Sequence, residues 1–146
     1  MRPALDLVTR PRRSDVSENL DAAIESRFAA IRDTTEALVA PLTAEDCALQ
    51  SMPDCSPAKW HLAHTSWFFE TFILEPTLAG YRVFNPAFRV LFNSYYQTVG
   101  EQYSRPRRSL LTRPSLEEVL RYRSHVNEAM AQLFAQTAPC APLAAA

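Results

Sequence analysis

The sequence predicts an all-α protein, folded as a single antiparallel four-helix bundle. Three observations carry this prediction: apolar residues recur at three- and four-residue steps in four segments, helix-start signals precede these segments, and none alternates with the two-residue period of a strand. The chain has 146 residues, 47% of them hydrophobic, which suits one domain with its own core. One segment is much more apolar than the other three, and a bundle places such a helix in its interior.

The first predicted helix begins after an arm at residues 1–16, in which prolines and arginines occur without periodicity. Ser17 can cap this helix, because a serine oxygen accepts a hydrogen bond from a free backbone N–H of the first turn. Apolar residues then recur at helical spacing up to a stop near Pro41, and we expect them to form one buried stripe. The stripe consists of Leu20, Ile24, Phe28, Ile31 and Leu38.

The second predicted helix, at about residues 57–75, is the apolar one. Ser56 and Pro57 mark its start, since proline at the first helical position loses no hydrogen bond. Apolar side chains cover most of its circumference, so we expect it in the middle of the bundle. They are Trp60, Leu62, Trp67, Phe68, Phe69, Phe72, Ile73 and Leu74.

The third predicted helix follows the same type of start signal at Asn85 and Pro86, and Gly100 is its expected stop. One stripe of apolar side chains runs between these ends. It consists of Phe88, Leu91, Phe92, Tyr95 and Val99.

The fourth predicted helix begins at a capping box, in which Ser115 and Glu118 each bond a free N–H of the other's turn. Its apolar stripe continues to about Ala135. The predicted domain therefore spans residues 17–136 and is followed by an alanine- and proline-containing tail at residues 137–146.

Composition excludes several classes of function. Glycine occurs only at Gly80 and Gly100, and loops that cradle phosphates need two or three closely spaced glycines. The net charge of −1 gives no general attraction to nucleic acid or to an acidic membrane surface. No apolar run approaches the roughly 20 residues that span a bilayer. We expect no nucleic-acid partner and no membrane association.

The cysteines indicate a reducing compartment. They are three in number, which leaves one unpaired in any disulfide framework, and none forms a C-x-x-C motif. The chain also lacks a continuous apolar stretch near its N-terminus that could serve as a secretion signal. We therefore expect a cytoplasmic protein. The three are Cys47, Cys55 and Cys140.

Histidine offers the first candidate chemistry. His64 shares a helical face with Trp60 and Trp67, and His61 lies three residues earlier, close enough for both rings to reach one metal ion. An alternative stays open from spacing alone: His64 is a core histidine whose ring nitrogen bonds a backbone carbonyl or a neighbouring side chain.

The arginines of one segment offer a second candidate chemistry, the binding of a carboxylate. Between residues 77 and 114 the chain has six arginines and one acid, Glu101. Arginine binds carboxylates through two parallel hydrogen bonds, so this segment could form a pocket for a carboxylate-bearing substrate. The alternative is a solvated loop whose arginines pair with acids of the first helix. The six are Arg82, Arg89, Arg105, Arg107, Arg108 and Arg113.

Specific strings narrow the choice. SPAKWHLAHTSWFFE at residues 56–70, LFNSYY at residues 91–96 and RPRR at residues 105–108 occur in this order. They resemble the N-terminal DinB-like domain of the EgtB family, the sulfoxide synthases of ergothioneine biosynthesis. The resemblance extends from about Leu20 to Phe134.

The resemblance implies a non-haem iron(II) enzyme that uses O₂ to join a sulfur donor to hercynine, with a sulfoxide as product. The donor in this family is cysteine or γ-glutamylcysteine. Three histidines hold the iron, one of which corresponds to His64. Arginines after the third helix bind the donor's carboxylates, and Arg105 and Arg108 are the matching residues. A further C-terminal domain completes the pocket.

The sequence departs from this family pattern after Phe134, where an H-E-x-x-H segment should supply the other two ligands. We therefore expect a DinB-like bundle that is incomplete at its C-terminal end, and no tightly bound iron in this chain alone, because iron(II) needs several oriented ligands. One hypothesis is a truncated EgtB-like protein, inactive alone and completed by a separately encoded part. The second is a non-catalytic DinB-like interaction module. A third, weaker one is a DinB-type thiol transferase with another metal.

Overall fold

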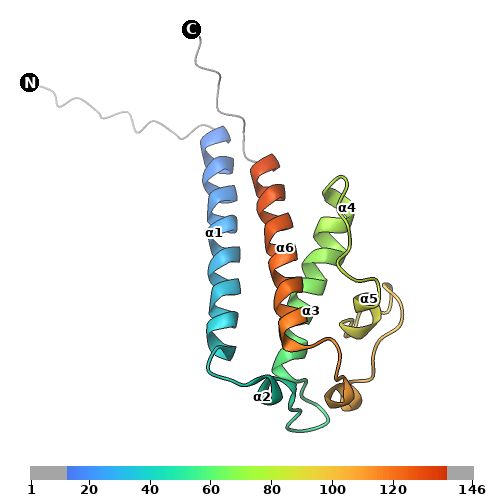
Figure 1. Cartoon of the computed structure of the whole chain (residues 1–146). Helices are drawn as coiled ribbons and strands as arrows, with labels where there is room; N and C mark the ends of the chain where they lie inside the picture. The colour runs from blue at the N-terminus through green and yellow to red at the C-terminus, as the bar shows by residue number, and fades with distance from the viewer. Residues whose placement is uncertain (1–12, 138–146) are drawn as a thin grey trace, which may run out of the picture.

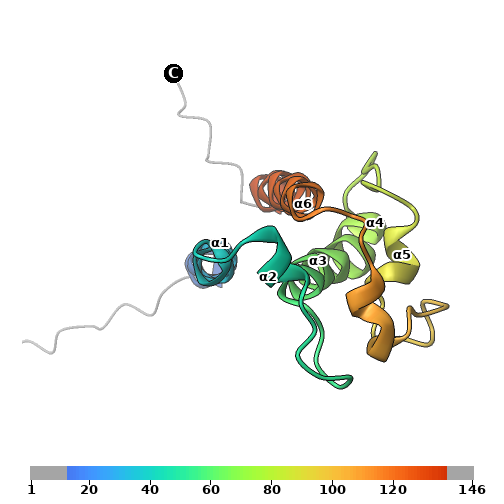
Figure 2. The same ribbon diagram turned by 60° about the horizontal axis from the view of Figure 1, so that its bottom comes forward.

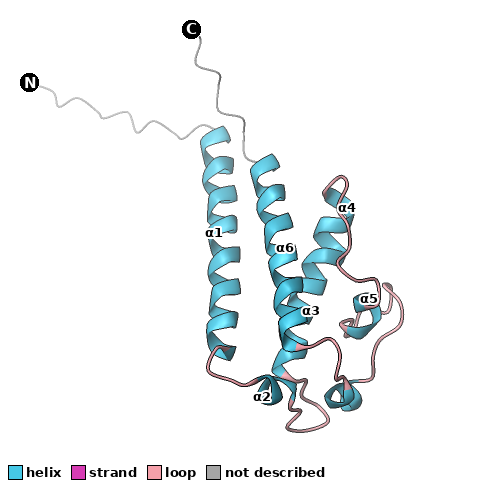
Figure 3. Ribbon diagram, viewed as in Figure 1, coloured by secondary structure: helices cyan, strands magenta, loops and turns pink. Residues whose placement is uncertain are grey.

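The computed structural model describes residues 13–137, all of which are helical or irregular, with no strand among them (Figure 3). The predicted all-α class is confirmed. In chain order the elements are α1 (Arg13–Val39), α2 (Ala44–Ala48), α3 (Ala58–Phe69), the π-helical turn η1 (Glu70–Leu74), α4 (Glu75–Thr77), α5 (Phe88–Leu91), the 3₁₀ helix η2 (Arg105–Leu110) and α6 (Leu116–Thr137).

Three long rods dominate the molecule: α1, the continuous run of α3, η1 and α4, and α6 (Figure 1). α1 runs antiparallel to the other two. α3 and α6 run parallel to each other, because the segment at residues 78–115 returns along the bundle before α6 begins. Seen from below, α5 and η2 lie on the side of α3 that faces away from α1 (Figure 2).

The third predicted helix is wrong over most of its length, since only the single turn of α5 forms. Asn93 accounts for the difference. Its Nδ2 donates to the carbonyl oxygens of Tyr96, Gly100 and Glu101, and its Oδ1 accepts from the backbone N–H of Tyr96. An asparagine that bonds nearby backbone groups competes with the helical hydrogen-bond pattern. The chain after α5 is therefore a loop folded around one buried side chain.

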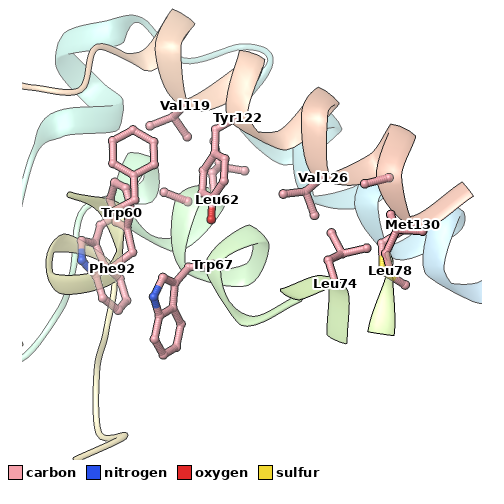
Figure 4. Packing of buried hydrophobic residues seen from close by; sticks show 13 residues of the cluster. Trp60, Leu62, Trp67, Leu74, Leu78, Phe92, Val119, Tyr122, Val126 and Met130 are labelled. Atoms are coloured by element: carbon pink, nitrogen blue, oxygen red, sulfur yellow. The ribbon is translucent and has the colours of Figure 1, made fainter. Parts of the chain in front are cut away.

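The hydrophobic core lies mainly between α3 and α6, as expected for the apolar second helix. Side chains of α6 point toward α3 along the contact (Figure 4). The capping serine is confirmed, because Ser115 Oγ accepts a hydrogen bond from the N–H of Glu118 at 3.2 Å. The labelled core residues are Trp60, Leu62, Trp67, Leu74, Leu78, Phe92, Val119, Tyr122, Val126 and Met130.

The predicted buried stripe of α1 is also wrong. Four of its five members are exposed to solvent, and only Phe28 is half-buried. The face that contacts α3 and α6 is instead centred on Arg32, which is 3% exposed, and lies roughly 90° around the helix from the centre of the predicted stripe. The exposed members are Leu20 at 59%, Ile24 at 48%, Ile31 at 54% and Leu38 at 70%.

Hydrogen bonds explain why α1 turns a polar face inward. Arg32 Nη2 donates to Ser66 Oγ at 2.7 Å on α3, and its Nε donates to Asn127 Oδ1 at 2.7 Å on α6. Arg123 of α6 is fully buried and donates to Leu62 O and Glu36 Oε1. Buried guanidinium groups need such partners, and the partners lie only at the junction of the three helices.

The proposed limits of the domain stay predictions. Residues 1–12 of the expected arm and residues 138–146 of the expected tail lie outside the described residues, and α1 begins at Arg13. Among the helices at residues 13–137, none combines the length and the apolar character needed to cross a bilayer.

Candidate functional site

The candidate site is centred on His64, whose imidazole α3 holds between two indoles. Trp60 lies four residues earlier and Trp67 three residues later, so the three side chains share one helical face. The centroid of the His64 ring is 4.6 Å from that of Trp60 with an interplanar angle of 15°, and 5.5 Å from that of Trp67 with an angle of 16°. His64 is therefore half-buried among the tryptophans, as its position on the helix predicts.

The backbone engages one ring nitrogen of His64. Nδ1 lies 2.7 Å from the carbonyl oxygen of Phe92, at the end of α5. A carbonyl only accepts hydrogen bonds, so Nδ1 carries the proton and Nε2 keeps its lone pair. Within residues 13–137, hydrogen bonds to this ring engage Nδ1 and not Nε2. A metal-binding imidazole is commonly oriented by such a bond from its second nitrogen.

Electrostatics favour the neutral form of this ring. Burial lowers the pKa of His64 below its ordinary value, because the charged imidazolium loses its water. The bond to Phe92 opposes this shift, and the positive charge of Arg108 adds to it. The neutral imidazole is the form that donates a lone pair to a metal ion.

Arg108 extends the stack on the other side of Trp60. Its guanidinium carbon lies 3.5 Å from the centroid of the indole, and its Nη1 donates to Ser56 Oγ at 2.6 Å. The residue is 3% exposed, and burial lowers the pKa of Arg108 to about 10, so it stays charged at pH 7. In this structure Arg108 holds η2 against the start of α3. Its role as a carboxylate ligand stays a prediction.

Arg105 lies at the start of η2 and at the edge of the site. Its guanidinium carbon is 4.6 Å from the ring centroid of Tyr95, whose hydroxyl it also contacts. Tyr95 is 71% exposed, so this pair is accessible from solvent. The substrate-binding role of Arg105 also stays a prediction.

The alternative for the arginine-rich segment was pairing with acids of the first helix. Among the described side chains, at residues 20–136, ion pairs join Arg89 to Glu75 and Arg123 to Glu36. Neither pair links the arginines at residues 77–114 to α1. The charges of Arg105 and Arg108 therefore lie near the histidines without a partner carboxylate among the described residues.

Gln50 is a positioning residue that the sequence analysis missed. Its Nε2 donates to the carbonyl oxygens of Cys55 at 2.7 Å and Arg105 at 2.9 Å, and its Oε1 accepts from the N–H of Ser109 at 2.9 Å. These bonds join the connector before α3 to η2 and so fix the arginines beside the histidines. A single glutamine in an irregular connector has no pattern from which this role could be predicted.

The described residues do not form a complete metal site. Among the side chains that the structure describes, at residues 20–136, no three or more histidine, cysteine, aspartate or glutamate residues gather around a point that could hold a metal ion. His64 offers one nitrogen, and His61 is exposed at the helix surface. Iron(II) lies low in the divalent affinity order and needs several oriented ligands. The role of His64 as an iron ligand stays a prediction.

Comparison with known protein families matches residues 27–145 to the DinB superfamily. The match covers most of the chain, including α3, the segment with α5 and η2, and α6. No curated protein was found to be similar to the sequence. The helical fold and this match agree with each other, and the chain is therefore a member of the DinB superfamily.

Proposed function

We propose that this chain is an EgtB-like component of ergothioneine biosynthesis. His64 supplies one iron ligand, and the other two come from a further polypeptide segment that carries an H-E-x-x-H motif. The complete assembly joins hercynine to cysteine or γ-glutamylcysteine with O₂, in the cytoplasm. Alone, the chain neither retains iron nor forms the sulfoxide. The family match supports only the DinB-like scaffold, and the EgtB assignment rests on the strings around His64 and Arg105.

The observation that carries the proposal is the orientation of His64. Trp60 and Trp67 fix the plane of its ring, and Phe92 fixes its tautomer. A core histidine can be held neutral by a backbone carbonyl in the same way, and what supports the proposal is that the lone pair on Nε2 is engaged by no described side chain and can coordinate a metal ion. A ligand that waits for a metal ion requires this state.

The arginines support the second half of the proposal. Burial is the main cause that lowers the pKa of both histidines; the positive charge of Arg108 lowers both further, and that of Arg105 lowers the pKa of His61. Arg108 Nε is buried and has no hydrogen-bond partner among the described residues. A carboxylate of the sulfur donor that entered here would give this N–H an acceptor and would be held by paired guanidinium donors.

Complementation tests the proposal. The chain is expressed alone and together with the remainder of an EgtB-family enzyme, beginning at its H-E-x-x-H segment. Iron content is measured by elemental analysis, and the sulfoxide by mass spectrometry after incubation with hercynine, γ-glutamylcysteine and O₂. We expect iron and product only in the combined sample. His64→Ala removes both, whereas the matched variant His125→Ala, on α6, leaves both unchanged.

Two results would contradict the proposal. Micromolar or tighter iron binding by the chain alone, lost in His64→Ala, would show a complete site within this polypeptide. Iron content of the combined sample that is unchanged by His64→Ala would show that His64 is not a ligand.

A second candidate function is a non-catalytic DinB-like interaction module. The apolar side chains that α1 presents to solvent favour it, because a helix in a self-sufficient bundle buries such a stripe. If the combined sample forms a stable complex without iron or product, this second function is supported and the first is not.

A further inference from the structure

An apolar groove lies between α1, the continuous run of α3 and η1, and α6, on a different face of α3 from His64. Its volume is about 480 Å³. The apolar side chains that line it come from all three elements. They include Ile24, Phe28, Ile31, Phe69, Ile73 and Met130.

The exposed stripe of α1 continues this groove outward. Leu20, Ile24 and Ile31 fall within about 40° of one another around the helix, at 100° per residue. Each is about half exposed or more. The groove and the stripe together form one continuous apolar surface along α1, and exposed apolar surfaces of this kind mark interaction sites on soluble proteins. We call it the α1 surface.

The charges beside the α1 surface are arranged symmetrically about one residue. Asp21 precedes Ile24 by three positions and Arg27 follows it by three, and both border the groove. In an antiparallel pair of identical helices related by a two-fold axis, residues equidistant from the axis on opposite sides face each other. An axis through Ile24 therefore places Asp21 of each copy opposite Arg27 of the other.

The same axis also matches the apolar residues. Leu20 lies four positions before Ile24 and Phe28 four positions after it, so these two side chains face each other twice across the pair. The two Ile24 side chains meet at the axis itself. The apolar residues and the charged residues of this surface are both arranged symmetrically about Ile24. The surface is therefore complementary to itself, as a two-fold dimer interface requires.

We propose that the α1 surface is a homodimer interface. A second copy of this chain covers the groove with its own α1, which runs antiparallel to the first. The two-fold axis passes through Ile24. This interface is independent of the proposed iron chemistry, because His64 faces α5 and not α1. It explains why α1 carries a helical apolar stripe that the single chain leaves in water.

Sedimentation equilibrium over a concentration series tests the association. We expect a monomer–dimer equilibrium that Ile24→Asp shifts to monomer, while the matched variant Leu49→Asp, at an exposed leucine outside the surface, leaves it unchanged. Arg27→Asp should weaken the dimer at least tenfold, which is about 1.4 kcal/mol. The double exchange Asp21→Arg with Arg27→Asp should restore it. Circular dichroism confirms that each variant is folded.

Cysteine cross-linking tests the register. In a chain with Cys55 and Cys140 replaced by serine, Ile24→Cys should form a disulfide-linked dimer on mild oxidation. Leu38→Cys should not, because fourteen residues from the axis in each copy separate the two positions by about 42 Å at 1.5 Å per residue. A parallel pairing would link both variants and would overturn the proposal. A monomer at every concentration, or a dimer unaffected by Ile24→Asp, would overturn it as well.

Discussion

The imidazole of His64 is tied to the backbone of Phe92 by a hydrogen bond of 2.7 Å between Nδ1 and the carbonyl oxygen. The two residues lie 28 positions apart in the chain, on α3 and at the end of α5. The long irregular segment between α3 and α6 therefore decides which nitrogen of His64 is available. Changes in that segment reach the candidate site without touching the histidine.

The stability of the fold should decrease in mild acid because of His64. Burial lowers its pKa in the folded state below the ordinary value of 6.5, so the unfolded chain binds a proton first as pH falls. This contribution is complete above about pH 6.5 and is lost as pH falls toward the lower folded pKa. Urea unfolding between pH 5 and pH 8 measures the slope.

His64→Gln should reduce this slope, and a further His61→Gln should reduce it again, because partial loss of water and the positive charge of Arg108 lower the pKa of His61 even though its side chain reaches the helix surface. An unchanged slope in the double variant would show that neither imidazole is shielded from water as the structure indicates.

Asn93→Ala should loosen the loop after α5. Its amide donates to three carbonyl oxygens in a buried position, and each lost bond leaves an acceptor that water must reach. We expect a loss of about 1–3 kcal/mol in the free energy of unfolding. Hydrogen exchange should rise at residues 94–104 and not in α6. Gln97→Ala, at an exposed residue of the same loop, is the control and should change neither measurement.

Glu70→Gln should destabilise the start of the π-helical turn. The carboxylate accepts from the hydroxyls of Tyr81 and Tyr122 and from the N–H of Phe84, all of which are donors. The amide of glutamine would place an N–H donor against one of these three donors. We expect this to lower the free energy of unfolding by about 1–3 kcal/mol.

Alkaline titration gives a second measure of the same group. Burial and the charge of Glu70 raise the pKa of Tyr81 and Tyr122 well above the usual value, so phenolate absorbance from both should lag behind that of exposed tyrosines. In Glu70→Gln, the phenolate absorbance of Tyr81 and Tyr122 should appear at a lower pH than in the parent chain. The surface variant Glu101→Gln should not change it. If both variants titrate like the parent chain, the contacts of Glu70 are not those described.

Arg123→Met should be one of the most damaging substitutions on α6. The guanidinium is fully buried and bonds Leu62 O, Thr35 Oγ1 and Glu36 Oε1, so its removal leaves acceptors of two helices without donors. We expect a loss of roughly 3 kcal/mol or more by urea unfolding. Arg121→Met, two residues away and exposed, should stay within about 0.5 kcal/mol of the parent chain.

Local pattern was sufficient for α3 and α6. The apolar circumference of residues 57–75 predicted the central helix, and the serine at position 115 predicted where α6 begins. The face shared by Trp60, His64 and Trp67 follows from helical geometry, so the stacked histidine was predictable as well. The sequence left two roles open for His64, a metal ligand or a core histidine bonded to a backbone carbonyl, and the structure shows the bond to the carbonyl of Phe92.

Tertiary structure alone decided the outer parts of the molecule. Periodicity predicts which residues of a helix share a face, but not which face is buried. The apolar face of α1 lies outward because Arg32, on another face, donates hydrogen bonds to Ser66 of α3 and Asn127 of α6. The apolar residues before Gly100 have helical spacing, but the side chain of Asn93 donates hydrogen bonds to the carbonyl oxygens of Tyr96 and Gly100, and these bonds compete with those of a helix. For α1 the deciding partners are distant in sequence, since Ser66 and Asn127 lie 34 and 95 positions from Arg32. The partners of Asn93 lie within eight positions of it, but its side chain is buried only in the folded protein. In both cases, burying the polar group without hydrogen bonds would cost more free energy than local helix propensity gains.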